Sequence, residues 1–290
     1  MAAREGAVSI EFALVAGSDN YCVFGNPVAH SKSPRIHAAF ARQTRQNMHY
    51  SAVLVPEREF PQAVRRFREL GGRGANVTLP FKQEAWRLCA ERRPRAQISG
   101  AVNTLWFGEG GAIVGDNTDG TGLVRDITVN RGLALRGADL LVLGAGGAAR
   151  GIIPALIEAA PRRLVIANRT PERAMELAAE FGALFPLTGC GFQALDGQCF
   201  DAIINATAAS LRGEVPPLPH GVIAAGGWCY DLMYGREPTA FLRWAAACGV
   251  ARRADGLGML VEQAAESFWI WRGIRPDTGP VIELLRSGDL

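Results

Sequence analysis

The stretch that decides the fold is "LLVLGAGGAARG", Leu140 to Gly151, where an apolar run meets a glycine-rich turn and a helix-like segment. Gly144, Gly146 and Ala149 have the spacing G-x-G-x-x-A. The glycines permit a tight turn and close approach of a pyrophosphate, and the small third residue permits close packing of helix on strand. The first N–H groups of the new helix favour a bound phosphate. A glycine-rich turn without a ligand is the alternative, but the strand before it and the helix after it favour a pyrophosphate site at Gly144, Ala145, Gly146, Gly147 and Ala148.

The segment "ANRTPER", after the next apolar strand, indicates which dinucleotide binds. A cofactor with a free ribose 2′-hydroxyl usually meets an acidic residue at this point. This chain instead carries Asn168, Arg169, Thr170 and Arg173. A guanidinium binds a phosphate through bidentate, charge-assisted bonds, so the site is predicted to bind NADP rather than NAD. A second interpretation, that Thr170 and Pro171 simply begin a helix, is compatible with the first.

Around this unit, short apolar runs alternate with helix-like segments, which predicts an α/β fold. A length of 290 residues favours two domains. Strands are predicted at 21–25, 48–55, 74–79, 138–144, 162–168, 200–207 and 227–234, and helices at 34–44, 57–70, 119–130, 147–159, 171–182, 240–249 and 258–273.

The composition excludes several classes of protein. Apolar residues make up 48% of the chain and charged residues 20%, as in an ordinary globular protein, and a net charge of +3 does not favour nucleic-acid binding. The six cysteines are scattered without a C-x-x-C pair, which argues against a disulfide framework and against a zinc site, so no metal is expected. Neither a signal peptide nor a membrane span is expected, and a cytoplasmic location fits these features.

In the stretch "GANVTLPFK", Lys82 is a single charged residue among mostly apolar neighbours. A nicotinamide enzyme that reduces a carbonyl also needs one positioned acid to protonate the new alkoxide. Lys82 is the candidate, with Asp119 of "GDNTDGTG" as the carboxylate that favours its ammonium form. A surface lysine at a helix start is the alternative for Lys82, although the helix dipole disfavours a cation there. For Asp119 the alternative is a helix N-cap.

Small polar residues elsewhere could bind a polyhydroxylated acid. Each of them alone would be typical of a turn or a cap. They are Ser31 and Ser33 in "AHSKSP", Thr78 in "NVT" and Asn103 in "AVNT".

Nine motifs, taken together and in order, resemble the shikimate dehydrogenase family. They are "VFGNPVAHSKSP", "GANVTLPFK", "GAVNTL", "GDNTDG", "LGAGGAARG", "ANRTPER", "INAT", "YDLMY" and "ADGLGMLVEQAAESF". The resemblance runs from about Tyr21 to the C-terminus. It implies reversible, NADPH-dependent reduction of 3-dehydroshikimate to shikimate in aromatic amino-acid biosynthesis.

The resemblance also implies the domain organisation. A substrate-binding and catalytic α/β domain at 1–118 is completed by the C-terminal helices at 255–290, and a Rossmann-type, doubly wound NADP-binding domain at 119–254 is inserted in the sequence. The expected partner is a small-molecule substrate, with no nucleic acid and no membrane, in a monomer or a homodimer.

Site residues follow from the matching motifs. Lys82 and Asp119 correspond to the family's catalytic pair, and Lys82 is expected to point at the substrate. The substrate contacts implied are Ser31, Ser33, Thr78, Asn103, Asp119, Tyr234 and Gln263. The cofactor contacts implied are Gly144 to Ala148, Asn168, Arg169, Thr170 and Arg173, with Leu232 and Gly256 on the nicotinamide side.

The chain departs from the family pattern at a few positions. Ala208 and Ala209 replace a common serine and glycine, Ala240 replaces a common proline, and Leu232 stands where some members carry Met. These changes bear on cofactor packing, not on the reaction. Residues 1–20 extend beyond the usual start of the family and are expected to be a disordered tail or the product of an upstream start codon.

Three other readings compete with the biosynthetic enzyme. A quinate/shikimate dehydrogenase paralogue using NAD is opposed by Arg169 and by the paired serines Ser31 and Ser33. A cofactor-binding sensor without turnover would not need the proton donor Lys82 beside Asp119. A methyltransferase would leave both Lys82 and the arginines after the second strand unexplained.

Overall fold

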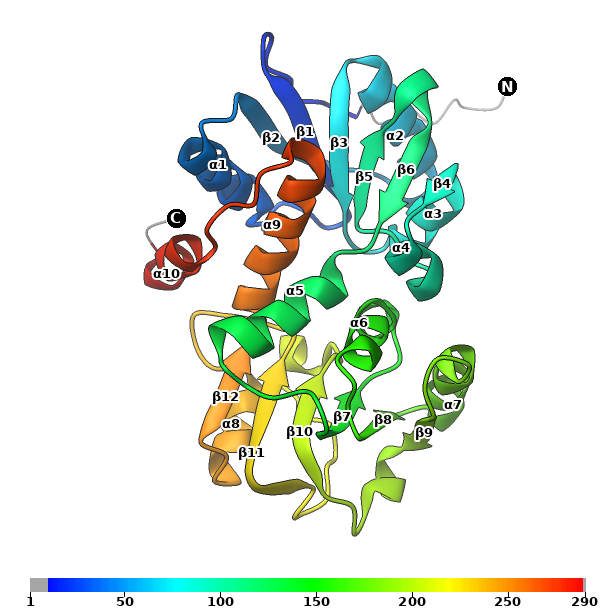
Figure 1. Cartoon of the computed structure of the whole chain (residues 1–290), viewed down its shortest axis with the longest axis vertical. Coiled ribbons are helices and arrows are strands. Elements are labelled where there is room, and N and C mark those ends of the chain that lie inside the picture. Colours follow the sequence, from blue (N-terminus) through cyan, green and yellow to red (C-terminus); the bar gives the residue numbers. More distant parts are fainter. Residues whose placement is uncertain (1–9, 289–290) are drawn as a thin grey trace, which may run out of the picture. The chain divides into compact units, whose positions relative to one another are not determined.

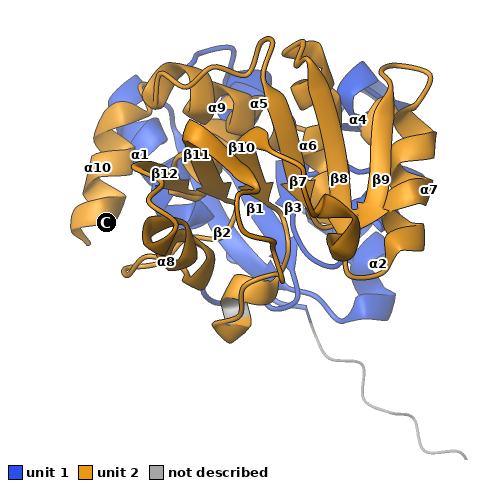
Figure 2. Ribbon diagram, turned by 90° about the horizontal axis from the view of Figure 1, so that it is seen from below, with its two compact units in different colours: residues 1–97, 101–116, 267–276 blue, residues 98–100, 117–266, 277–290 orange. Residues whose placement is uncertain are grey.

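The computed structural model describes residues 10–288, which form two compact units (Figure 2). Unit 1 comprises 10–97, 101–116 and 267–276, and unit 2 comprises 98–100, 117–266 and 277–288. Each unit has its own six-stranded sheet and its own apolar core. Within residues 10–288, no helix combines the length and the apolar character needed to cross a membrane.

The sheet of unit 1 is mixed (Figure 1). Strand β1 pairs in parallel with both β2 and β3, whereas β5 runs antiparallel to β3 and β6, and β4 pairs in parallel with β6. In sheet order the strands are β2 (Met48–Leu54), β1 (Asp19–Gly25), β3 (Gly72–Val77), β5 (Thr104–Phe107), β6 (Ile113–Asp116) and β4 (Glu91–Arg92). The first helices of the chain are α1 (Ser33–Thr44), α2 (Phe60–Glu69), α3 (Lys82–Leu88) and α4 (Pro94–Ser99).

The sheet of unit 2 is parallel throughout. Its strands lie in the order β12 (Arg252–Asp255), β11 (Ile223–Asp231), β10 (Phe200–Asn205), β7 (Asp139–Leu143), β8 (Arg163–Asn168) and β9 (Leu187–Gly191). Counted from β7, this is the strand order 3-2-1-4-5-6 of a doubly wound fold that binds dinucleotides. The later helices are α5 (Asp119–Arg125), α6 (Gly147–Glu158), α7 (Pro171–Phe181), α8 (Ala240–Ala247), α9 (Leu257–Arg272) and α10 (Gly279–Ser287).

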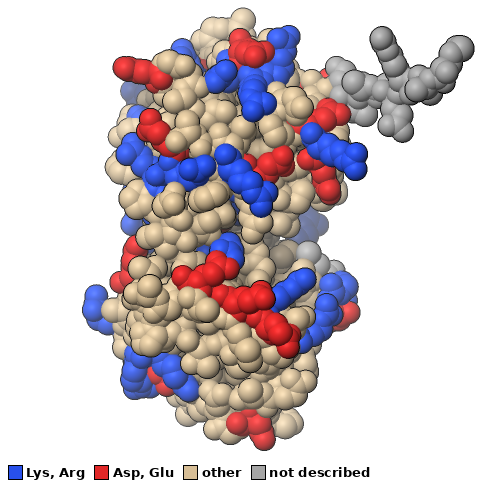
Figure 3. Space-filling model, turned by 90° about the vertical axis from the view of Figure 1, so that its right-hand side faces the viewer, with Lys and Arg blue, Asp and Glu red and all other residues tan. Residues whose placement is uncertain are grey.

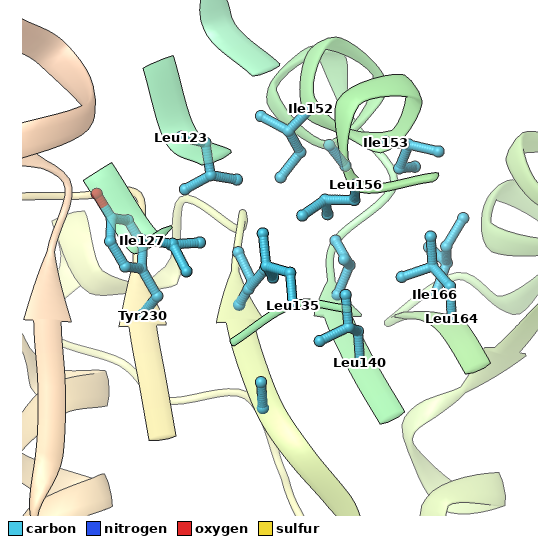
Figure 4. Packing of buried hydrophobic residues seen from close by; sticks show 14 of the residues in the cluster. Leu123, Ile127, Leu135, Leu140, Ile152, Ile153, Leu156, Leu164, Ile166 and Tyr230 are labelled. Carbon is cyan, nitrogen blue, oxygen red and sulfur yellow. The ribbon is translucent and has the colours of Figure 1, made fainter. Parts of the chain in front are cut away.

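The core of unit 2 fixes the two elements that flank the glycine-rich turn. Leu140 of β7 and Leu164 and Ile166 of β8 are fully buried against the side chains of α6, as Figure 4 shows. Ile152 and Leu156 of α6 are also fully buried in this cluster. Apolar area removed from water stabilises this packing by about 25 cal/mol per Å². The turn between β7 and α6 is therefore held at both ends by core residues.

A buried hydrogen bond joins β11 to Asp126, the residue that follows α5. The Tyr230 hydroxyl donates to Asp126 Oδ2 at 2.7 Å, and both residues are fully buried. Asp126 Oδ1 accepts a second hydrogen bond from Asn130 Nδ2 at 3.0 Å and faces Arg131 at 3.6 Å. These partners satisfy a carboxylate that could not otherwise be buried at acceptable cost.

We expect Tyr230→Phe to lower the free energy of unfolding by about 1–2 kcal/mol, because the Asp126 carboxylate then keeps its burial but loses a donor. Urea denaturation measures the change. Tyr21→Phe is the matched control, since its hydroxyl accepts a long bond of 3.4 Å from Arg272. Equal stability of the Tyr230 variant and the parent would contradict the role given to this contact.

The predicted α/β architecture is confirmed, with corrections at the ends of several elements. The strand predicted at 74–79 is β3, Gly72–Val77, so Thr78 lies just beyond it. The helix predicted over 119–130 ends as α5 at Arg125 and continues as a π-helical turn, Asp126–Asn130. The strands predicted at 200–207 and 227–234 end earlier, at Asn205 and Asp231. At these two positions the side-chain oxygen accepts a bond from the N–H two residues on, which turns the chain out of the strand.

Several elements have no counterpart among the predicted ones: α3, α4, β4, β5, β6, β9, β12 and α10. The expectation of a disordered tail over 1–20 concerns residues 1–9, which lie outside the described residues, and residues 10–20, for which it is wrong. Ile10, Phe12 and Leu14 pack against the core of unit 1, and the Phe12 and Phe67 rings lie 5.6 Å apart.

Candidate functional site

The glycine-rich turn of unit 2 has the shape that a pyrophosphate requires. Gly144 has φ 104°, a left-handed conformation that favours glycine, and an added Cβ would lie 3.2 Å from the Ala206 backbone. Gly146 and Gly147, at the start of α6, are exposed, and an added Cβ there would meet no atom within 4 Å. The turn is thus open where the first N–H groups of α6 begin, and Ala149 is fully buried behind it. This geometry fits the predicted approach of a phosphate to the backbone.

The segment after β8 presents its two arginines to solvent. Asn168 Nδ2 donates to the Thr170 carbonyl at 2.9 Å, which shapes the turn into α7. Thr170 occupies the N-cap position of α7, but its side chain makes no capping hydrogen bond. Arg169 and Arg173 are exposed. They are therefore accessible to an anionic group at the carboxyl edge of the sheet.

The charge of Arg169 reaches the loop after β10. The pKa of the Glu214 carboxyl is lowered first by the hydrogen bond from Arg212 and further by the positive charge of Arg169. Arg212 holds Glu214 through bonds of 2.9 and 3.1 Å. The turn after β8 and the loop after β10 follow parallel strands whose carboxyl ends share one edge of the sheet.

Asn205 and Asp231 anchor the loops that follow β10 and β11. Asp231 is fully buried, and burial raises the pKa of its carboxyl, although four hydrogen-bond donors oppose this effect. The donors are Ser210 Oγ at 2.7 Å, Thr239 Oγ1 at 2.6 Å, Asn205 Nδ2 at 3.1 Å and the Met233 N–H at 3.1 Å. Sequence reasoning gave these two residues no role. A polar residue that ends an apolar strand, in "INAT" and in "YDLMY", was the available signal.

Leu232 and Gly256, both predicted on the nicotinamide side, do lie together. An added Cβ at Gly256 would collide with the Leu232 carbonyl oxygen, and the Gly256 N–H donates to the Met233 carbonyl at 3.1 Å. Only glycine therefore allows this approach. Tyr234, two residues beyond Leu232, is half-buried, and the pKa of its hydroxyl is raised by burial and then by the charge of Asp255.

Asp119 and Gln263 lie on adjacent helices of unit 2. Asp119 begins α5, is 6% exposed, and its N–H donates to Asn117 Oδ1 at 3.0 Å. One turn later, an added Cβ at Gly122 would lie 2.7 Å from Cβ of Gln263 on α9. The glycine thus allows the two helices to touch, and it places two of the predicted substrate residues on neighbouring elements.

In unit 1, the predicted substrate residues gather at the edge where β1 and β3 end. The Thr78 N–H donates to the Phe24 carbonyl at 2.9 Å, and the Thr78 methyl group lies against Gly25. Ser31 and Ser33 follow β1 at the start of α1, where the Ser33 N–H donates to Ser31 Oγ at 3.3 Å. Because β1 and β3 are parallel, their carboxyl ends share this edge.

Lys82 and Asn103 join the same edge through backbone bonds. Lys82 is the first residue of α3 and is half-buried, and its carbonyl accepts the Val102 N–H at 2.9 Å. Asn103 is 2% exposed; its carbonyl accepts the Val77 N–H at 2.8 Å, and its Oδ1 accepts the Thr104 hydroxyl at 2.9 Å. A lysine, an amide and three hydroxyl-bearing residues therefore come together in this unit, although they are separated in the sequence.

Charge elsewhere is mixed in sign. Figure 3 shows one face of the molecule, on which basic and acidic side chains are interspersed. Within unit 2, Arg150 of α6 forms a two-point ion pair with Glu180 of α7, at 2.5 and 2.7 Å. Among residues 10–288, no group of three or more His, Cys, Asp or Glu side chains is placed to hold a metal ion.

The doubly wound sheet, the open glycine turn at the start of α6 and the exposed arginines after β8 define a protein of the dinucleotide-binding class. Three family models match successive parts of the chain: the shikimate dehydrogenase substrate binding domain at residues 23–105, shikimate / quinate 5-dehydrogenase at 127–212, and the shikimate 5′-dehydrogenase C-terminal domain at 256–286. The chain belongs to the shikimate dehydrogenase family of oxidoreductases.

Individual relatives agree with this assignment. The chain is 56% identical to a shikimate dehydrogenase (NADP(+)) of Alkalilimnicola ehrlichii, over 93% of this chain and 99% of the relative. It is 53% identical to a protein of the same name from Nitrosococcus oceani, over 92% and 95%. A crystal structure of shikimate 5-dehydrogenase from Thermus thermophilus, in complex with NADP(H) and shikimate, superposes with a TM-score of 0.83 at 36% identity, covering 93% of this chain and 99% of the other.

The predicted family, fold and enzyme class are thereby confirmed. NADP, the cofactor predicted from Arg169 and Arg173, is also the cofactor in the names of these relatives. The roles of single residues stay predictions. The same holds for the division into a substrate domain at 1–118 plus 255–290 and an NADP domain at 119–254.

Proposed function

We propose that the chain catalyses the reversible, NADPH-dependent reduction of 3-dehydroshikimate to shikimate, a step of aromatic amino-acid biosynthesis. The observation that carries the proposal is the cluster at the carboxyl edge of β1 and β3. There Lys82 and Asn103 lie beside the turn that holds Thr78, and the serines of the β1–α1 loop join them. An ammonium group among hydroxyl and amide groups suits a small polyhydroxylated acid.

We assign the cofactor to the open turn of unit 2. Gly144 to Ala148 and the start of α6 would hold the pyrophosphate, and Arg169 and Arg173 would hold the 2′-phosphate. Leu232 and Gly256 would lie on the nicotinamide side, where the loops after β11 and β12 meet. When bound, NADPH supplies the hydride that reduces the substrate carbonyl carbon.

Residues of the chain would transfer the proton. Lys82, as an ammonium, donates one proton to the oxygen that gains negative charge, and its neutral amine takes the proton back in the oxidation direction. Asp119 serves as the partner carboxylate and as a substrate contact. The hydroxyl groups of Ser31, Ser33 and Thr78, with the amides of Asn103 and Gln263 and the Tyr234 hydroxyl, orient the ring and its carboxylate.

The direct test is absorbance at the NADPH band, with shikimate or quinate as substrate and NADP or NAD as oxidant. We expect rapid reduction of NADP by shikimate and little change in the other three mixtures. Comparable rates with quinate or NAD would move the chain to the quinate/shikimate paralogues. No reaction in any mixture, with cofactor binding intact in calorimetry, would identify a ligand sensor.

A further inference from the structure

A glycine in the second turn of α6 lies directly beneath the carboxylate of Asp119. Gly151 is buried, and a Cβ added to it would lie 3.1 Å from Asp119 Oδ2 and 3.5 Å from Asn117 Nδ2. The first of these distances is shorter than ordinary van der Waals contact, so the Asp119 carboxylate would have to shift by a few tenths of an ångström to admit a methyl group. The residue falls outside the predicted pyrophosphate turn, which ends before it.

A second contact shows that the two helices meet here through their backbones. A Cβ added to Gly120, the residue after Asp119, would lie 2.7 Å from Cβ of Ala155 and 3.1 Å from the Gly151 carbonyl oxygen. Helix α5 therefore rests on α6 at Gly151 and Ala155, with no long side chain between them. The helix that begins at the pyrophosphate turn also supports the residue that begins α5.

Glycine is an unfavourable residue at the position of Gly151, inside a helix. In a helix interior, alanine is favoured over glycine because glycine loses more backbone freedom on folding. Gly151 lies inside α6, four residues beyond its first residue. Local stability therefore opposes glycine at this position, and the close approach of Asp119 supplies a reason for it.

We propose that Gly151 is a positioning residue: its lack of a side chain sets where the Asp119 carboxylate lies on the cofactor helix. This inference rests on the proposed function, because it takes Asp119 as a substrate and catalytic residue. Placement errors of about 1 Å can cost on the order of a hundredfold in rate when they move a catalytic group, and the smaller shift required here is expected to cost less. A methyl group at Gly151 would press on the Asp119 carboxylate.

We expect Gly151→Ala to lower kcat/KM for shikimate by about tenfold or more, to leave the Kd of NADP within about twofold, and to leave the thermal midpoint unchanged or raised. Gly279→Ala is the matched control, because an added Cβ in α10 meets its nearest atom, Asp277 Oδ1, at an ordinary 3.5 Å. An unchanged kcat/KM in Gly151→Ala would overturn the inference. So would a parallel loss of NADP binding or of thermal stability, which would show a general distortion of α6.

A double-mutant cycle with Asp119→Ala shows whether Gly151 acts through that carboxylate. Calorimetric binding of shikimate is the readout, since it does not need turnover. Gly151→Ala should weaken binding in the parent and have no further effect in the Asp119→Ala background. The same loss in both backgrounds would overturn the inference while leaving the substrate role of Asp119 intact. If Asp119→Ala alone changed neither binding nor turnover, the assigned role of Asp119 would fail, and the inference with it.

Discussion

Lys82→Ala should lower kcat for shikimate oxidation by roughly 10²–10⁴-fold, the range that a positioned general acid–base group contributes. The Kd of shikimate and of NADP should change by less than about threefold, because the hydroxyl and amide groups of the edge and the whole cofactor turn remain. Stopped-flow absorbance at the NADPH band measures the rate, and calorimetry measures both dissociation constants. A large loss of binding with little loss of turnover would show that Lys82 only binds the substrate.

The basic residues of the chain are almost all arginines. Lysine occurs only at Lys32 and Lys82 among 31 lysine and arginine residues. A guanidinium stays protonated at any relevant pH, so arginine can supply charge but cannot donate a proton and later recover it. A lysine at the start of α3, where the helix dipole disfavours a cation, is consistent with a need for proton transfer.

Lys82→Arg is therefore the informative companion of Lys82→Ala. It keeps the positive charge, so we expect shikimate binding to survive, while turnover should fall nearly as far as in the alanine variant. Retention of a substantial rate in Lys82→Arg would show that the site needs the charge alone. With lysine at only two positions, labelling of the lysine side chains with ¹⁵N also allows the titration of Lys82 to be followed directly.

The elements that the sequence predicted correctly are those with a strong pattern of their own. Strands β7 and β8 are continuous apolar runs because neighbouring strands and helices cover both faces. The strands that escaped prediction include the edges of the sheets. In β12 the letters are "RRAD", and in β9 they are "LTGCG". An edge strand is partly solvent-exposed, so its sequence need not be apolar, and a search for apolar runs misses it.

The residues of the candidate site likewise fall into those that the local sequence predicted and those that it could not. Turn glycines and arginines beside a strand could be recognised because their chemistry depends on the local chain, as at Gly144 and Arg169. The four donors around Asp231 and the carboxylate above Gly151 depend on contacts between elements. A periodic pattern carries no information about such contacts, since neither partner is unusual within its own segment.

Arg169→Ala should raise the Kd of NADP by about 10–100-fold, since a charge-assisted hydrogen bond is worth about 1.5–3 kcal/mol. The Kd of NAD should change by less than about twofold, because NAD lacks the phosphate that the guanidinium would bind. Calorimetric titration of both cofactors gives the ratio, and a fall of the NADP effect at high salt would support its charge origin. Because Arg169 is exposed, we expect its truncation to leave folding intact.

Arg162, at the other end of β8, offers a control for the loss of charge. It immediately precedes β8, at the end opposite Arg169, and its guanidinium pairs with Asp139 at 2.7 Å on an exposed surface. Arg162→Ala removes the same charge from unit 2, so any effect of net charge on cofactor binding would appear in both variants. We expect it to leave both dissociation constants unchanged. An equal loss of NADP and NAD affinity in Arg169→Ala would reject the 2′-phosphate assignment, and the preference for NADP would then have to come from Arg173 or another residue of that turn.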